Sequence, residues 1–179
     1  MGNLVFALYN IVDRIFIGKG LGSTELAGVS LLFPIMTFII GLEIIVSIGA
    51  GVLVSIKLGQ KNKAYAQQIL GNVITIYGII SVLMIIVGFL FIDKILIMCG
   101  ASNATFPFAK NYFLTLLPFF FFQFISMGLN NIIRAESNIK IAMITILIAT
   151  FTNIILNPIF IFTFKLGVVG SAIATDFGM

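Results

Sequence analysis

The sequence predicts an all-α integral membrane protein, a polytopic bundle of about six transmembrane helices. Hydrophobic residues make up 60% of the 179 residues and charged residues only 9%. The mean hydropathy of +1.21 is far above that of water-soluble domains. The apolar runs are also too long and too uniformly apolar for barrel strands, which alternate over about ten residues. Because hydrocarbon offers the backbone no hydrogen-bond partners, these runs must be helices.

Turns rich in charge or glycine separate the expected spans. The first and last spans are incomplete, since each is shorter than the roughly 20 residues that cross a hydrocarbon core. We expect Pro34 to kink the second span and Asn157-Pro158 to break the fifth. We expect a polar connection over Asp93–Lys110. The predicted spans are Leu4–Ile17, Leu26–Ile56, Ile69–Ile92, Phe113–Ile133, Ile141–Phe164 and a sixth that begins at Val168.

The distribution of lysine and arginine predicts the orientation of the chain in the membrane. The positive-inside rule places the more basic connections, those after the second and fourth spans, in the cytoplasm. These connections hold Lys57, Lys61, Lys63, Arg134 and Lys140, whereas the opposite side holds Lys19, Lys94, Lys110 and Lys165.

Composition also excludes several classes of function. The chain has no histidine, which removes histidine-based zinc sites and Ser-His-Asp triads, and we expect no enzyme. The net charge is +4, but the lysines and arginines do not form a continuous basic run, which argues against a nucleic-acid partner.

Two acidic residues, Asp13 and Glu43, fall inside the predicted spans. An ionisable group at a helix centre costs roughly 2.5 to 3.5 kcal/mol on insertion scales, so each acid is a candidate functional residue. The alternative for Asp13 is a carboxylate near the helix end that reaches water. The alternative for Glu43 is a polar group that faces an aqueous cavity and has no role in ion coupling.

The fifth span carries a set of polar residues on one face. Thr150, Asn153 and Asn157 stand at i, i+3 and i+7. Pro158 cannot donate a hydrogen bond to the carbonyl of Ile154, so a free carbonyl is expected beside the two amides. Transporters place ion and substrate sites at such broken helices. The alternative is that the asparagines only hydrogen-bond a neighbouring helix.

A stripe of small residues on the second span predicts close helix packing. Ser47, Gly51 and Ser55 stand at i, i+4 and i+8, so another helix can approach the backbone along this stripe.

Four motifs follow one another along the chain. They are Tyr9–Gly18 with Leu21-Gly22 and Leu26–Ser30, then Ser55–Gln60, then Arg134–Asn138, and then Asn153–Pro158 with Gly167–Thr175. This set resembles the motifs of the MATE family of multidrug and toxic compound exporters. The resemblance implies a fold of two pseudo-symmetric six-helix lobes, of which residues 1–179 are a truncated N-terminal lobe without the C-terminal lobe.

The resemblance implies an antiporter in the bacterial inner membrane that exports amphipathic organic cations in exchange for sodium ions or protons. By motif match, the cation site consists of Asp13, Asn153, Asn157 and Thr175. We expect Glu43 and Thr150 at the substrate cavity, and no cofactor or metal other than the coupling ion. The expected partners are organic cations, the lipid bilayer and the C-terminal lobe of the same protein.

One departure from the family pattern bears on the coupling ion. Position 157 is asparagine where the family often has aspartate, so the predicted site holds one carboxylate rather than two. Amide, hydroxyl and carbonyl oxygens can complete a sodium site, whereas a proton trap of two carboxylates cannot form. We therefore expect sodium rather than protons.

Two other functions stay open. The chain is a non-transporting remnant or membrane scaffold if it works without a second lobe, because alternating access needs two lobes to move about a shared site. Alternatively, it is part of a flippase for lipid-linked oligosaccharides, which shares the wider fold. Flippase cavities tend to be strongly cationic, and apart from Arg14 the predicted spans contain no arginine or lysine.

Overall fold

A computed structural model of the chain describes residues 16–18 and 20–178. Within these ranges the regular structure is helical. Its elements are α2 (Ser23–Ser30), α3 (Phe33–Gly59), α4 (Lys63–Met98), α5 (Phe106–Leu116), the 3-10 turn η1 (Leu117–Phe119), α6 (Phe120–Ala135), α7 (Ile139–Pro158), the π-helical turn η2 (Ile159–Thr163) and α8 (Gly167–Phe177).

Four helical segments are long and apolar enough to cross a membrane. They are Ser23–Gly59, Lys63–Met98, Phe106–Ala135 and Ile139–Thr163, and α8 is a shorter apolar helix. The predicted all-α membrane fold is thus confirmed. The first predicted span, Leu4–Ile17, lies almost entirely outside the described residues.

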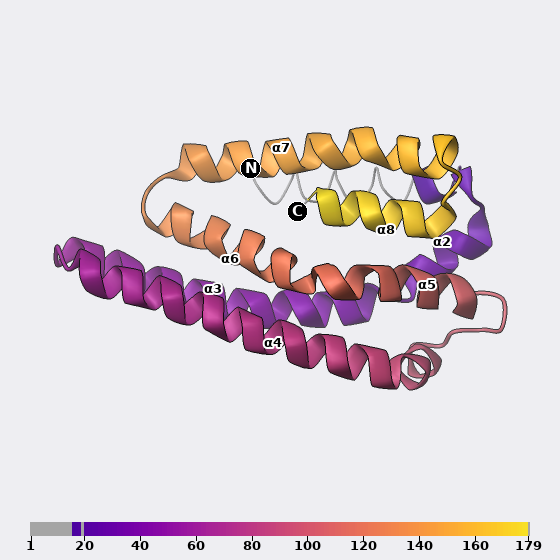
Figure 1. The fold of residues 1–179 in the computed structure, drawn as a ribbon, viewed down its shortest axis with the longest axis horizontal. Coiled ribbons are helices and arrows are strands. Elements are labelled where there is room, and N and C mark those ends of the chain that lie inside the picture. Colours follow the sequence, from indigo (N-terminus) through magenta and orange to yellow (C-terminus); the bar gives the residue numbers. More distant parts are fainter. Residues whose placement is uncertain (1–15, 19, 179) are drawn as a thin grey trace.

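The helices run back and forth along one long axis (Figure 1). The paired helices α3 and α4 lie along one side, α7 and α8 lie along the other, and α5 and α6 run between them. Accordingly, α6 packs against α3, α4 and α7, while α5 packs against α8, α4 and α2. The turns between α3 and α4 and between α6 and α7 therefore lie at one end, and the α4–α5 and η2–α8 connections lie at the other.

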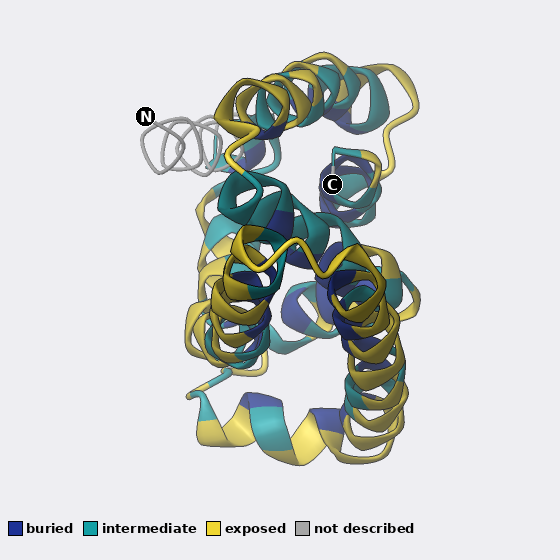
Figure 2. Ribbon diagram, turned by 90° about the vertical axis from the view of Figure 1, so that its left-hand side faces the viewer, coloured by how far each residue is buried: buried dark blue, intermediate teal, exposed yellow. Residues whose placement is uncertain are grey.

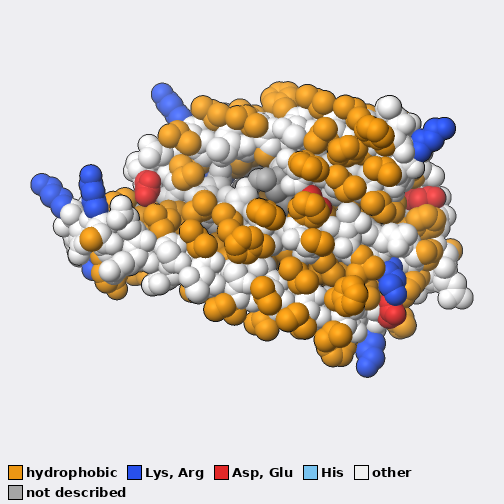
Figure 3. Space-filling view, in the orientation of Figure 1, with side chains coloured by type: hydrophobic (Ala, Val, Ile, Leu, Met, Phe, Trp, Pro, Cys, Tyr) orange, Lys and Arg blue, Asp and Glu red, His pale blue; other side chains and the backbone are white. Residues whose placement is uncertain are grey.

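The surface of the bundle is apolar along its length and charged at its ends. Large hydrophobic side chains such as Ile45, Phe89 and Leu90 are more than two-thirds exposed on α3 and α4. Hydrophobic side chains extend along the visible flank, and lysine and arginine gather at the two ends (Figure 3). Exposed residues cover the outer sides of the helices and buried residues lie between them (Figure 2). This pattern suits a bundle whose solvent is lipid.

The second predicted span is divided into two helices by a turn directly before Pro34, where a kink is expected. The chain turns at Leu31 and Leu32, between α2 and α3, and Pro34 lies in the first turn of α3. A proline at this position breaks no helical hydrogen bond, because the first N–H groups of a helix have no partner within it.

The polar connection predicted over Asp93–Lys110 is shorter than expected. Helix α4 continues to Met98 and α5 already begins at Phe106. The helix extends because Leu96 is fully buried, while Asp93 and Lys94 remain exposed. Lys110 Nζ also lies 2.6 Å from Asp93 Oδ1, which joins α4 to α5.

The break predicted at Asn157-Pro158 is a change of helix type. The α-helix reaches Pro158 and continues as the π-helical η2 to Thr163, where the amide of Phe164 donates to the carbonyl of Ile159 at 3.0 Å. The path of the chain therefore stays helical beyond Pro158.

Candidate functional site

Two buried asparagines lie where α7 meets the end of α8. Asn153 and Asn157 have no exposed surface. They share one face of α7, and Nδ2 of Asn157 donates to Oδ1 of Asn153 at 3.4 Å. The neighbouring helix comes very close, because a Cβ atom at Gly178 would lie 2.7 Å from the Cβ of Asn153. Thr175, one turn before Gly178, is only 6% exposed. Three predicted site residues therefore lie in one interface.

At this interface, Nδ2 of Asn153 and Oγ1 of Thr175 have no hydrogen-bond partner among the described residues. Oδ2 of Asp176, on the next residue of α8, has none either. A buried polar atom without a partner costs about 1 to 3 kcal/mol, and water cannot supply one inside a bilayer. Carboxylate, hydroxyl and amide oxygens are the ligands that hard cations prefer. The amide oxygens of the two asparagines and Oγ1 of Thr175 therefore offer ligands of the kind that a cation site needs, whereas Nδ2 of Asn153 is a hydrogen-bond donor and needs an acceptor.

Asp176 is an acidic residue of this region that the sequence analysis missed. It lies in α8 directly after Thr175, so the prediction that Asp13 and Glu43 are the only acids within spans is wrong. The signal that could have identified it is an aspartate in an otherwise apolar run. Asp176 also weakens the argument that the site holds a single carboxylate.

Of the remaining predicted site residues, the structure describes Thr150 and Glu43. Asp13 is outside the described residues. Thr150 is half-buried on α7, and its hydroxyl donates to the carbonyl of Ile146 at 2.8 Å. Glu43 lies on α3 and is 1% exposed, in the part of the bundle formed by α3, α4 and α6. The roles predicted for these three residues stay predictions.

The small residues of α3 form the predicted close contact, and their partner is α6. Ser55 Oγ donates to the carbonyl of Ala135 at 2.8 Å, and Asn131 Nδ2 donates to Ser47 Oγ at 3.0 Å. A Cβ atom at Gly51 would lie 3.3 Å from the Cβ of Ala135. The interpretation of this stripe as a helix-packing surface is confirmed.

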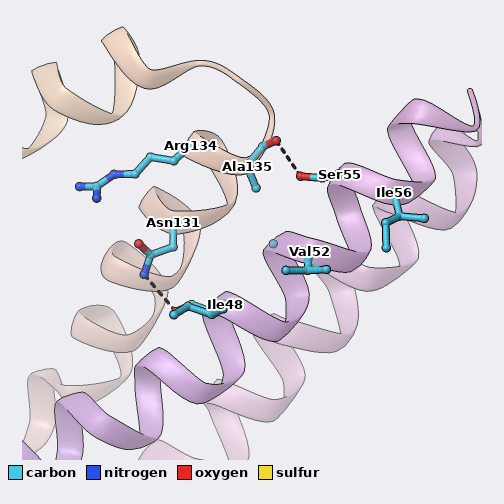
Figure 4. A pocket seen from close by; sticks show the side chains of 9 residues that line it. Ile48, Val52, Ser55, Ile56, Asn131, Arg134 and Ala135 are labelled. Carbon is cyan, nitrogen blue, oxygen red and sulfur yellow. Dashed lines mark hydrogen bonds between the residues drawn. The ribbon is translucent and has the colours of Figure 1, made fainter.

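An open groove of about 440 Å³ lies along this contact. Apolar side chains of α3 form one wall, and α6 forms the other (Figure 4). Asn131 points towards α3, whereas Arg134 extends away from it. The groove is lined by Ser47, Ile48, Gly51, Val52, Ser55, Ile56, Asn131, Arg134 and Ala135.

Comparison with known proteins places these features in a family. The family model MatE matches residues 1–159. Multidrug export protein MepA of Staphylococcus aureus (strain bovine RF122 / ET3-1) is 34% identical over 98% of this chain. Probable multidrug resistance protein YoeA of Bacillus subtilis (strain 168) is 27% identical over the same share. This chain spans 39% of the length of each of these relatives.

The fold has a close counterpart among solved structures. The structure of the MATE multidrug transporter DinF-BH superimposes with a TM-score of 0.93 at 36% sequence identity. The match covers 99% of this chain and 40% of the transporter.

Proposed function

This chain belongs to the MATE family, and we propose that it forms one lobe of an exporter that moves organic cations out of the cell. We also propose that this exporter lies in the bacterial inner membrane and works as an antiporter. Relatives named as multidrug export and multidrug resistance proteins support the substrate class. Since the chain spans 39% of these relatives, the activity belongs to the complete protein with its second lobe.

The observation that carries the proposal is the buried polar cluster between α7 and α8. Asn153, Asn157 and Thr175 bring amide and hydroxyl oxygens together in a part of the bundle that excludes water and lipid. We propose that these residues, with Asp13 and with Asp176 beside them, bind the coupling cation. Export would follow if cation binding and substrate binding favour opposite openings of the two lobes.

We propose sodium as the coupling ion, because the acid that many family members carry at position 157 is an asparagine here. Neutral amide oxygens bind sodium but cannot take up a proton near neutral pH. Asp176 also bears on the choice between sodium and protons, because this acidic residue directly follows Thr175 in α8.

Reconstituted complete protein can test the coupling ion. We expect an imposed sodium gradient to drive accumulation of a fluorescent organic cation in proteoliposomes, and a proton gradient to drive much less. Asn157→Asp should raise the response to the proton gradient, while the matched variant Asn111→Asp, at an exposed position of α5, should not. Equal responses of wild type and Asn157→Asp to both gradients would contradict the assignment. Absence of transport in both gradients would favour a remnant or scaffold.

The flippase alternative is less well supported. A cavity that holds a lipid pyrophosphate needs basic side chains. Within the described residues, the buried polar and charged side chains include Glu43, asparagine, glutamine, serine and threonine, and no lysine or arginine.

A further inference from the structure

We propose that Glu43 binds a proton inside the bundle, at a site reached from the α3–α6 groove through the hydroxyl groups of Ser47 and Tyr77. The site is separate from the α7–α8 cluster. The proposal does not depend on what the complete protein transports.

A negative charge on the Glu43 carboxylate would have no counter-charge near it among the described residues. Its side chain is 1% exposed, and Oε2 has no hydrogen-bond partner among the described residues. An ionised carboxylate left without a counter-charge in such surroundings is strongly destabilising. A bound proton removes that charge without requiring any further ligand.

Among the described residues, no basic group of the neighbouring helices forms an ion pair with this carboxylate. Helix α4 carries no lysine or arginine between Lys63 and Lys94, and Tyr77 is the titratable group that it places against Glu43. Helix α6 carries one charged residue, Arg134, which lies near Ser55. At 1.5 Å per residue, Ser55 is about 18 Å along α3 from Glu43. The ion pair found within the described ranges joins Lys110 to Asp93, at the far end of α4 from Lys63.

A second argument favours a proton over a metal cation. A sodium ion would need several oxygen ligands besides the carboxylate. The nearby hydroxyl groups already make hydrogen bonds: Tyr77 donates to the backbone carbonyl of Glu43 at 3.2 Å, and Ser47 donates to the carbonyl of Ile44 at 3.3 Å. Ser81, which is also buried, donates to the carbonyl of Gly78 at 2.9 Å. Each of these hydroxyl oxygens keeps lone pairs, but the described residues hold no group of three or more histidine, cysteine or acidic side chains that could bind a metal ion.

Two hydroxyl groups, those of Ser47 and Tyr77, lie between the groove and the backbone of Glu43. Asn131 and Ser47 both line the groove, and Asn131 donates to Ser47 Oγ at 3.0 Å. Figure 4 shows Asn131 directed towards α3. The Ser47 side chain also lies close enough to the Tyr77 hydroxyl to interact with it, and that hydroxyl donates to the backbone carbonyl of Glu43 at 3.2 Å. Because a hydroxyl both donates and accepts, these two groups can pass a proton.

The position of Tyr77 is fixed by its neighbours on α6. Its ring stacks on Phe124 with a centroid distance of 5.6 Å and an interplanar angle of 20°. On another side it lies against Gly128, where there is no room for a Cβ atom. A fully buried phenol held in this way keeps its hydroxyl beside Glu43 in the resting bundle.

Infrared spectroscopy of the complete protein in lipid vesicles tests the proposal. At neutral pH, we expect the carbonyl band of a protonated carboxylic acid in the wild type, and loss of that contribution in Glu43→Gln, which mimics the neutral acid in shape. The control Glu136→Gln, at the α6–α7 turn, should keep the band. Glu43→Asp should keep a shifted band, which gives a second measurement if Glu43→Gln folds poorly.

The route is tested by transfer of the same protein into heavy water. We expect Ser47→Ala to slow the deuterium shift of the Glu43 band without removing the band. Identical carbonyl bands in wild type and Glu43→Gln would overturn the proton site. Unchanged exchange in Ser47→Ala would overturn the route. Neither measurement involves transport, so a failure here leaves the proposed export function standing, and a failure of export leaves this site standing.

Discussion

Single residues decide how closely α4 and α6 approach. Tyr77 of α4 occupies the space beside Gly128, stacks on Phe124 and donates to the backbone of Glu43 on α3. One aromatic side chain thus links three helices, and its place depends on the absence of a side chain at position 128.

We therefore expect Gly128→Ala to destabilise the folded bundle by about 1 to 3 kcal/mol, the usual cost of overpacking a filled interior. The added methyl group meets the ring of Tyr77 and must displace it. Thermal unfolding of the complete protein in detergent measures the effect. Gly71→Ala is the matched control, because a Cβ atom at Gly71 meets nothing within 4 Å. Equal melting temperatures for the two variants would disprove this packing.

At this scale the sequence predicted part of the candidate site. The spacing of Asn153 and Asn157 predicted a shared face, and the motif match added Thr175. The spacing did not reveal that Asn157 donates to Asn153 or that α8 presses against Asn153, since both depend on the path of the chain between the helices. Asp176 was missed because an incomplete apolar run was not treated as membrane interior.

At the scale of elements, the α3–α6 contact is the one that the sequence described best. Serine and glycine at four-residue intervals predicted a close approach, and hydrogen bonds to Asn131 and Ala135 now identify the partner helix. Periodicity finds a packing face but not its partner. It also located the irregularities at Pro34 and Pro158 without showing their form, because a proline can begin a helix or be followed by a π-helical turn.

Gly51→Leu should push α6 away from α3 and lower stability by about 1 to 3 kcal/mol. The reason is that even a Cβ atom at this position would lie 3.3 Å from Ala135. Gly49→Leu provides the control on the same helix, since a Cβ atom there meets nothing within 4 Å. Thermal unfolding in detergent measures both, and the account fails if Gly49→Leu is the more harmful change.

The ion pair between Asp93 and Lys110 should contribute little to stability. Both side chains are partly exposed, and exposed pairs contribute about 0 to 1 kcal/mol. Asp93→Asn should therefore shift the thermal midpoint only slightly, and added salt should reduce the difference further. A large loss of stability would mean that this contact does more than join the ends of α4 and α5.

At the scale of the whole molecule, charge distinguishes the two ends of the bundle. The end with the α3–α4 and α6–α7 turns carries Lys57, Lys61, Lys63, Arg134 and Lys140 against Glu136. The described residues of the opposite end carry Lys94, Lys110 and Lys165 against Glu25 and Asp93. The positive-inside rule predicts that the first end faces the cytoplasm.

Cys99 provides a direct test of this orientation. It is the single cysteine of the 179 residues, it is free and half-buried, and it follows α4 at the less basic end. With other cysteines of the complete protein removed, an impermeant maleimide should label Cys99 in intact cells. Cys99→Ser combined with Lys61→Cys should be labelled only after the membrane is opened. The reverse pattern would invert the assigned orientation.

The central claim is that the α7–α8 polar cluster couples a cation to export, and ethidium accumulation in cells expressing the complete protein tests it most directly. The account predicts low accumulation with the wild type and with the exposed-site control Asn111→Ala. It predicts high accumulation with Asn153→Ala, Thr175→Ala and Asp13→Asn, each present in the membrane at the wild-type amount. Full efflux by all three variants would contradict the claim.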